Sequence, residues 1–195
     1  MLTSDKSFLE SVGDCFFMVV ALSSTTGFGT HDYDQWPVFS QIILWGLMIM
    51  GGCAGSTAGG LKMNRIILFA RLTYQEMVQS FRPHQVFHIK LNGVAPDSKV
   101  LLQASMFIAL AMSLFGGSVL IVGLIEPGLD FQSVIGTVMG SLFNIGPGFG
   151  MVGPTDNYGF LKDGTKIFLS LLMVMGRLEF FAVLVLFVPS LWRKY

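Results

Sequence analysis

Two short glycine-rich segments carry the residues whose types and spacing point to chemistry. The first is Thr25-Thr26-Gly27-Phe28-Gly29-Thr30, and its Gly-Phe-Gly core recurs 121 residues later at 148–150. Each segment follows a mostly apolar run of helix length, 8–22 in the first case and 131–143 in the second. Glycine lets the backbone turn its carbonyl oxygens toward a pore axis, where they replace the water around an ion. A short helix followed by a glycine-rich extended segment, found twice, therefore predicts an ion selectivity filter.

A third glycine-rich segment, Gly51–Gly60, predicts an irregular loop inside a membrane. Five of its ten residues are glycine, and each disfavours a helix by ~1 kcal/mol relative to alanine. The apolar run before it, 38–50, would extend about 20 Å as a helix, less than a hydrocarbon core of ~30 Å. Irregular backbone at that depth is tolerated where it is buried in protein or lines water. Close helix packing through small residues is the alternative. A phosphate-binding loop is excluded because 60–63 lacks the Gly-Lys-Ser/Thr ending.

The elements that must position these segments are those of an integral membrane protein. Of the 195 residues, 52% are hydrophobic and 12% are charged, about half the charged fraction of a soluble domain. The net charge is zero, so nothing favours nucleic acid as a partner. The apolar runs 100–125 and 165–188 are long enough to span a membrane, whereas 8–22 and 131–143 suit helices that stop part-way.

The charges orient the chain in the membrane. Between 62 and 99 six cations stand against two anions: Lys62, Arg65, Arg71, Arg82, Lys90 and Lys99 against Glu76 and Asp97. Such an excess marks the cytoplasmic side, so both glycine-rich filters would open to the outside. Asp32 and Asp34, just after the first filter, would then lie at the outer mouth. There they either concentrate cations or are ordinary solvated loop residues.

Arg177 is the cation that the pattern places deepest in the membrane. It lies 12 residues from both Thr165 and Pro189, or about 18 Å from either end of the last apolar run. An arginine there is unfavourable by ~2.5–3.5 kcal/mol unless it faces protein or water. We therefore expect it either to project into the pore below the filters, next to Gly51–Gly60, or to pair with another group as a structural charge.

The sequence leaves two classes of function open. An enzyme would need a converging nucleophile, base or metal cluster, and the sequence has no Ser/His/Asp set, no HExxH and no paired intramembrane acids. The first hypothesis is a cation-conducting pore. The second is a non-conducting fragment or a membrane scaffold subunit.

Four motifs resemble one family. Thr25-Thr26-Gly27-Phe28, the segment Gly51–Gly60, Asn144-Ile145-Gly146-Pro147-Gly148-Phe149-Gly150 and Gly176-Arg177-Leu178-Glu179 look like the potassium-uptake membrane subunits of the Trk and Ktr type, most like the TrkH/TrkG branch. The resemblance implies an all-α integral membrane fold built from helix–pore helix–filter–helix repeats of potassium-channel type. Family members carry four such repeats in one chain, and about one and a half are present here, as in the C-terminal portion of a member.

The resemblance also divides the chain. It implies a third repeat lacking its first helix over 1–71, a cytoplasmic linker over 72–99 and a fourth repeat over 100–195. The expected parts are pore helix 8–22, filter 25–30, broken helix 37–71 with intramembrane loop 51–60, helix 100–125, pore helix 131–143, filter 144–150 and helix 165–188.

The resemblance implies potassium uptake through a carbonyl-lined filter with an intramembrane gate. The expected ion-binding residues, acting through backbone carbonyls, are Thr25, Thr26, Gly27, Phe28, Asn144, Ile145, Gly146, Pro147 and Gly148. The expected gate residues are Gly51, Gly52, Gly55, Ser56, Thr57, Gly59, Gly60 and Arg177. No cofactor is expected, and potassium is the substrate, carried by channel-like flow or symport. The expected partners are membrane lipid, a second copy in a homodimer and a cytosolic nucleotide-binding ring of the TrkA or KtrA type. The expected location is the bacterial cytoplasmic (inner) membrane.

Overall fold

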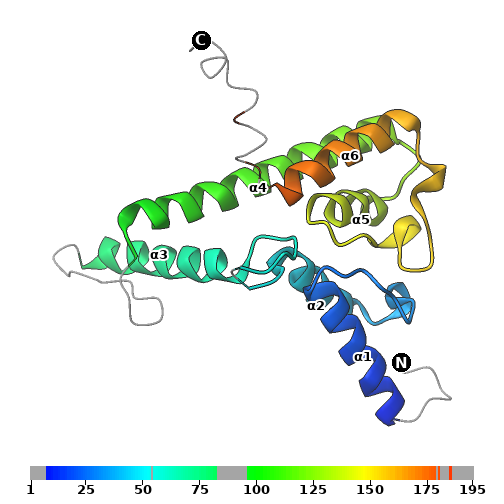
Figure 1. Ribbon diagram of the computed structural model, residues 1–195, viewed down its shortest axis with the longest axis horizontal. Coiled ribbons are helices and arrows are strands. Elements are labelled where there is room, and N and C mark those ends of the chain that lie inside the picture. Colours follow the sequence, from blue (N-terminus) through cyan, green and yellow to red (C-terminus); the bar gives the residue numbers. More distant parts are fainter. Residues whose placement is uncertain (1–7, 54, 83–95, 179, 181–184, 186–195) are drawn as a thin grey trace.

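The computed structural model describes residues 8–53, 55–82, 96–178, 180 and 185. Every regular element in those residues is a helix, which confirms the predicted all-α fold (Figure 1). The α-helices are α1 (Phe8–Ser23), α2 (Val38–Met50), α3 (Met63–Phe81), α4 (Ser98–Ile125), α5 (Phe131–Leu142) and α6 (Asp163–Arg177). The 3₁₀ helices are η1 (Tyr33–Gln35), η2 (Gly150–Val152) and η3 (Tyr158–Phe160).

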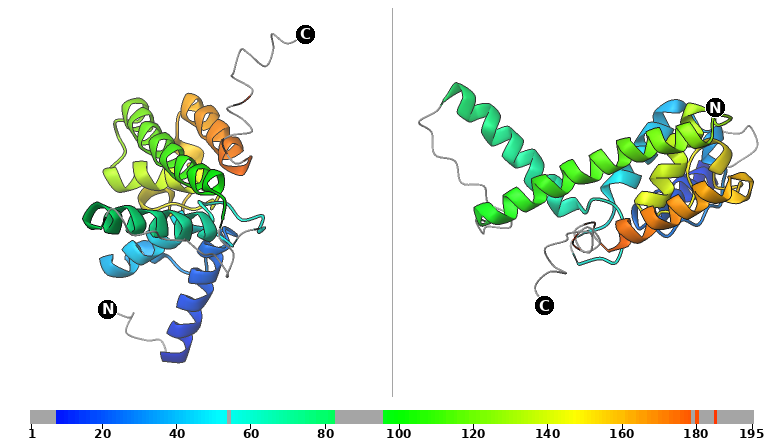
Figure 2. Two further views of the ribbon diagram at one scale, coloured as in Figure 1. Left: turned by 90° about the vertical axis from the view of Figure 1, so that its left-hand side faces the viewer. Right: turned by 90° about the horizontal axis from the view of Figure 1, so that it is seen from above.

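The short helix α5 lies at the centre of the fold. It packs against α4, α6 and α2, while α3 contacts and crosses α4 and α1 contacts α2 (Figure 2). Nearly every side chain of α5 from Ser133 to Leu142 is buried. Figures 1 and 2 show α1 extending away from the other helices. Among the described residues, α4 is the one helix long and apolar enough to cross a membrane.

Two glycines explain how close α5 comes to its neighbours. A Cβ on Gly136 would overlap the backbone of Phe149, and a Cβ on Gly140 would lie 2.7 Å from the Tyr158 hydroxyl and 2.8 Å from the Gly146 carbonyl oxygen. Glycine weakens a helix interior by ~1 kcal/mol relative to alanine. Here the absence of a Cβ lets the loop that follows α5 approach the helix closely. The segment after α5 therefore folds back directly onto α5.

The helix after the glycine-rich loop is longer than the sequence predicted. We expected it to end at residue 71 and a linker to cover 72–99, but α3 continues to Phe81. No glycine or proline interrupts the sequence before Pro83, which has no backbone N–H and disfavours helical geometry in the preceding residue. Within the rest of the expected linker, 83–95 lie outside the described residues, and Ser98 and Lys99 already belong to α4.

The last predicted helix is interrupted within the described residues, since Val185 is helical again after the end of α6. We expected one helix over 165–188 with Arg177 near its middle, but α6 ends at Arg177. The N–H of Phe180 donates to the carbonyl of Met175 at 3.0 Å, and Phe180 has a φ of +40°. A bond back over five residues is a normal way to end a helix. Arg177 is therefore at a helix end, and 181–184 and 186–188 lie outside the described residues.

Candidate functional site

The two predicted filters begin with the same backbone conformation. After α1, the N–H groups of Thr26 and Gly27 both donate to the carbonyl of Ala21, at 2.9 and 3.4 Å. After α5, the N–H groups of Ile145 and Gly146 both donate to the carbonyl of Gly140, at 3.0 and 3.2 Å. The φ angles follow the same order: Thr25 +54° and Gly27 +75° in the first segment, Asn144 +55° and Gly146 +103° in the second. Positive φ is uncommon for residues other than glycine, least so for asparagine and more so for the β-branched threonine, so the two segments share an uncommon conformation.

This match corrects the alignment of the two segments. The equivalent residues are 119 apart, from Thr25 to Asn144 and from Gly27 to Gly146, not 121 apart as the repeated Gly-Phe-Gly suggested. Phe28 and Phe149 therefore have different roles. Phe28 is 71% exposed, whereas Phe149 is fully buried with its ring 4.8 Å from that of Tyr33 and 5.3 Å from that of Trp45.

The two segments lie against each other. A Cβ on Gly27 would overlap the carbonyl oxygen of Ile145 and come within 3.0 Å of the Pro147 ring. The carbonyl of Ile145 therefore faces the first segment. Two other carbonyls of the second segment face tyrosines: the Tyr158 hydroxyl donates to Gly146 O at 2.7 Å, and the Tyr33 hydroxyl donates to Gly148 O at 2.6 Å.

Asp34 is tied to the far end of the second segment. Its Oδ2 accepts the N–H of Gly150 at 2.9 Å, and its backbone carbonyl accepts the Gln41 amide at 2.7 Å. Asp34 is thus not an ordinary solvated loop residue. Burial raises the pKa of its carboxyl to about 6; the N–H of Gly150 acts the other way, and nearby Asp32, Asp156 and Asp130 add to the rise.

The raised pKa of Asp34 predicts a pH dependence of stability. An acid whose pKa rises on folding from 3.8 to about 6 binds its proton more tightly in the folded state. Its contribution to stability is complete below pH 3.8 and is lost as the pH rises through about 6. We expect the Tm of the complete gene product in detergent to rise between pH 7.5 and 5, and to rise less in Asp34→Asn. Equal pH shifts in the two proteins would contradict this assignment.

The glycine-rich loop lies against both segments. The N–H of Leu61 donates to Ile49 O at 3.0 Å and that of Met63 donates to Gly52 O at 3.1 Å, so the two ends of the loop meet. The N–H of Gly59 donates to the Thr25 hydroxyl at 2.9 Å. A Cβ on Gly59 would overlap the Phe143 carbonyl and lie 3.1 Å from the Asn144 side chain.

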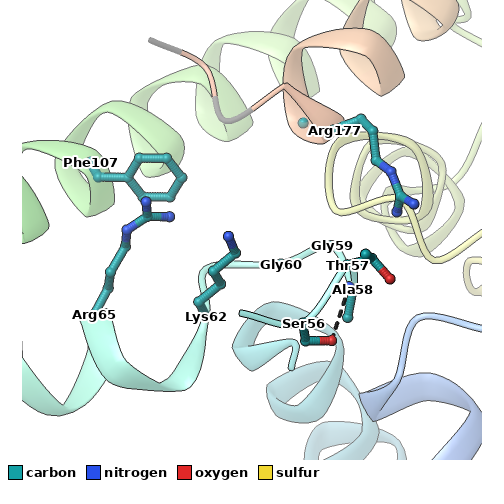
Figure 3. Close-up of a pocket in the computed structure, with 10 residues that line it drawn as sticks. Ser56, Thr57, Ala58, Gly59, Gly60, Lys62, Arg65, Phe107 and Arg177 are labelled. Carbon is teal, nitrogen blue, oxygen red and sulfur yellow. Dashed lines mark hydrogen bonds between the residues drawn. The ribbon is translucent and has the colours of Figure 1, made fainter. Parts of the chain in front are cut away.

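Arg177 and the glycine-rich loop border one cavity of about 200 Å³. Figure 3 shows the Arg177 side chain reaching from the end of α6 toward the chain at Thr57 and Gly59. The remaining lining residues are Ser56, Ala58, Gly60, Lys62, Arg65, Phe107 and Gly176. The Arg65 guanidinium lies 3.9 Å from the centre of the Phe107 ring, a cation–π contact. The lining residues include three cations and, among the described residues, no acid.

The predicted gate and filter residues therefore gather in one region, apart from Gly55, which lines a second cavity between α3 and α4. Sequence reasoning missed Tyr33 and Tyr158, whose hydroxyls hold the second segment, and the contact of Asp34. Each of these contacts joins residues 12 to 116 positions apart. No local pattern marks them. The only available signal was that Tyr33 and Asp34 directly follow the first segment.

Comparison with known proteins identifies the family to which this chain belongs. The family described as "TrkH: Cation transport protein" matches residues 6–194. The chain belongs to the TrkH family. The TrkH "Trk system potassium uptake protein" of Escherichia coli K12 is 37% identical over 189 residues, and the TrkG protein of that strain is 30% identical over 188. The crystal structure of the potassium transporter TrkH from Vibrio parahaemolyticus matches with a TM-score of 0.86 at 35% identity.

The match covers most of this chain but a smaller part of its relatives. It includes 97% of this chain and 38% of E. coli TrkH, 96% and 37% for TrkG, and 97% and 40% for the V. parahaemolyticus structure. The TrkH family is a family of cation transporters, not of enzymes. Membership in it, together with the apolar helix α4, makes the chain an integral membrane protein.

Proposed function

We propose that this chain takes part in potassium uptake across the bacterial cytoplasmic membrane and supplies two of the filter segments of the pathway. The observation that carries the proposal is the repeated backbone geometry, in which Thr25 and Gly27 match Asn144 and Gly146 in φ and in hydrogen bonding. Potassium selectivity requires carbonyl oxygens held in a fixed arrangement. The C-terminal ends of α1 and α5 carry partial negative charge directly before the two segments, which favours a cation there.

The two segments do not contribute in the same way. In the first, the carbonyls of Thr25, Thr26, Gly27 and Phe28 bind the ion. In the second, the carbonyls of residues 144–148 do so. Two of these carbonyls, of Gly146 and Gly148, also accept a hydrogen bond from the hydroxyl of Tyr158 and of Tyr33, and each keeps a second lone pair for the ion. The tyrosines therefore hold the second segment in shape, and among the described residues no equivalent bond holds the first.

The segment Gly51–Gly60 acts as a gate below the filters. Its contact with Thr25 and its close approach to Phe143 put it at the base of both segments. Arg177 adds a positive charge beside the same loop, which raises the energy of a passing cation. Within the described part of the loop, one hydrogen bond joins it to a predicted filter segment, from the Gly59 N–H to the Thr25 hydroxyl, so the loop can move away without breaking a filter backbone bond.

The proposal extends to the surroundings of the chain and is supported there by the family resemblance of its motifs and by its charges. The basic region 62–99 faces the cytoplasm, and the filters open to the outside. The potassium pathway is completed by further repeats of the same type. The protein is a homodimer, and a cytosolic nucleotide-binding ring of the TrkA or KtrA type docks on its cytoplasmic side. The chain carries potassium without a bound cofactor.

The direct test is potassium-dependent growth. Cells lacking their own potassium uptake systems are given the complete gene product and grown at limiting potassium. The proposal predicts growth and rubidium uptake above the empty vector at equal membrane expression. A scaffold without transport predicts neither.

Shortening the glycine-rich loop is expected to open the pathway. Because the bonds Leu61–Ile49 and Met63–Gly52 join its ends, residues 53–57 can be deleted without moving α2 relative to α3. We expect potassium flux to rise several-fold and to become independent of cytosolic regulation. The measurement is uptake per molecule of membrane-inserted protein. Normal insertion with unchanged, still regulated flux would contradict the gate role.

A further inference from the structure

The outer part of the second filter is held by the loop that follows the first. Tyr33 in η1 is fully buried, and its hydroxyl donates to Gly148 O at 2.6 Å, across 115 residues of sequence. The same tyrosine ring packs at 4.8 Å on the ring of Phe149. One side chain thus fixes both the carbonyl of residue 148 and the side chain of residue 149.

Asp34 fixes the next residue along the same segment. Its Oδ2 accepts the N–H of Gly150 at 2.9 Å, and a Cβ on Gly153 would lie 2.6 Å from that oxygen. The carboxylate therefore sits in a space that a glycine leaves open. Its other oxygen, Oδ1, is buried and makes no hydrogen bond within the described part of the chain.

The η1 loop that presents both residues is itself braced. The Asp32 carboxylate accepts the N–H of Asp34 at 3.1 Å and the Gln35 amide at 2.9 Å. The Gln41 amide, from α2, donates to the carbonyls of Asp34 and Trp36 at 2.7 and 3.0 Å. The loop is therefore a rigid support.

From these contacts we propose that Tyr33 and Asp34 are positioning residues that set the outer end of the second filter and thereby its ion selectivity. The proposal rests on the proposed potassium pathway. It adds that the ion selectivity of the second filter depends on the η1 loop, which follows the first filter. The segment held is Gly148-Phe149-Gly150, whose two glycines give the backbone wide conformational freedom when nothing restrains it. The restraint comes from η1 and from α5, which contacts the same residues through Gly136.

The experiment compares variants that remove single contacts in the complete gene product. Tyr33→Phe removes the hydroxyl and keeps the ring on Phe149. Asp34→Ala removes the acceptor for Gly150, whereas Asp34→Asn keeps an oxygen that accepts the same N–H and loses the charge. Asp156→Asn is the matched control, because Asp156 borders the open surface cavity next to Gly150 but its side chain makes no hydrogen bond to the filter backbone within the described residues.

The measured quantity is the permeability of potassium relative to sodium, from reversal potentials, beside potassium flux per folded molecule. We expect Tyr33→Phe and Asp34→Ala to lower the permeability ratio at least threefold while flux changes less than twofold. Asp34→Asn and Asp156→Asn should keep the ratio near wild type. Wild-type ratios in both Tyr33→Phe and Asp34→Ala would overturn the positioning role. Loss of selectivity in Asp156→Asn as well would also overturn it, in favour of a general charge effect at the mouth. A wild-type protein that does not select potassium would instead refute the proposed function.

Discussion

Gly27→Ala is expected to lower the selectivity for potassium over sodium at least tenfold. Gly27 has a φ of +75°, and an added Cβ would overlap the carbonyl oxygen of Ile145 and crowd the Pro147 ring. An L side chain in that region is unfavourable by ~1–2 kcal/mol before any clash is counted. The strain is relieved only by moving one of the two filter segments, and a free-energy change of ~1.4 kcal/mol is already tenfold in a binding ratio.

The matched control for this substitution is Gly13→Ala. Gly13 lies in α1, directly before the same filter, and a Cβ there would meet nothing within 4 Å. Alanine also favours the helix at that position. Reversal potentials in mixed potassium and sodium should therefore separate the two variants at equal insertion. Wild-type selectivity in Gly27→Ala would mean that the first segment is not a filter.

Arg177→Ala is expected to increase potassium flux several-fold per folded molecule. The guanidinium reaches over the loop that carries Thr57 and Gly59 and borders the cavity below the filters. A unit charge 4 Å from a monovalent cation contributes ~4 kcal/mol of repulsion at an effective dielectric constant of about 20. A small part of that energy suffices for a several-fold change in flux, since ~1.4 kcal/mol corresponds to a factor of ten in rate.

Two control variants, Arg177→Lys and Lys99→Ala, test whether potassium flux depends on a positive charge at the position of Arg177. Arg177→Lys keeps the charge and should keep flux close to wild type. Lys99 is an exposed residue in the first turn of α4, so its loss should leave flux unchanged. A fall in flux per folded molecule in Arg177→Ala would show that the arginine is structural and would end the barrier role.

The elements of this fold could be predicted because their signals are local. The helices expected over 8–22, 100–125 and 131–143 match α1, α4 and α5 to within two residues at each end. The glycines at 51–60 predicted a break between two helices, and α2 ends at Met50. Apolar content and glycine act on their immediate neighbours in sequence, so both are visible without a structure.

The alignment of the two proposed filter segments could not be predicted, because the repeated residues and the repeated backbone geometry lie at different spacings. Gly-Phe-Gly at 148–150 resembles Gly-Phe-Gly at 27–29, yet Phe149 is a buried contact of Tyr33 and Phe28 is exposed. The geometry depends on which N–H groups close the end of the helix, and Asn144 takes the place of Thr25 despite a different side chain. Because threonine and asparagine both adopt this backbone conformation, the equivalent positions have different residue types, and a comparison of the two sequences does not align them.

The end of α6 was also hidden from the sequence. The apolar run continues past Arg177, and a single arginine is a weak signal for a helix end. Near this end, α6 packs closely on the turn after α5: Gly176 lies directly against the carbonyl of Leu142, where a Cβ would overlap it, and the Asn144 amide donates to Met173 O at 3.1 Å. These contacts join residues about 30 positions apart, so no local pattern in the sequence marks them.

Locating the ion tests the central claim most directly. Crystals of the complete gene product grown with rubidium in place of potassium would show the ion by its anomalous scattering. A potassium filter built from the two segments predicts a peak between the backbone carbonyls of residues 25–28 and those of 144–148, on the filter side of Gly59. Well-ordered filter segments with no peak there, or a peak found only elsewhere in the protein, would contradict it.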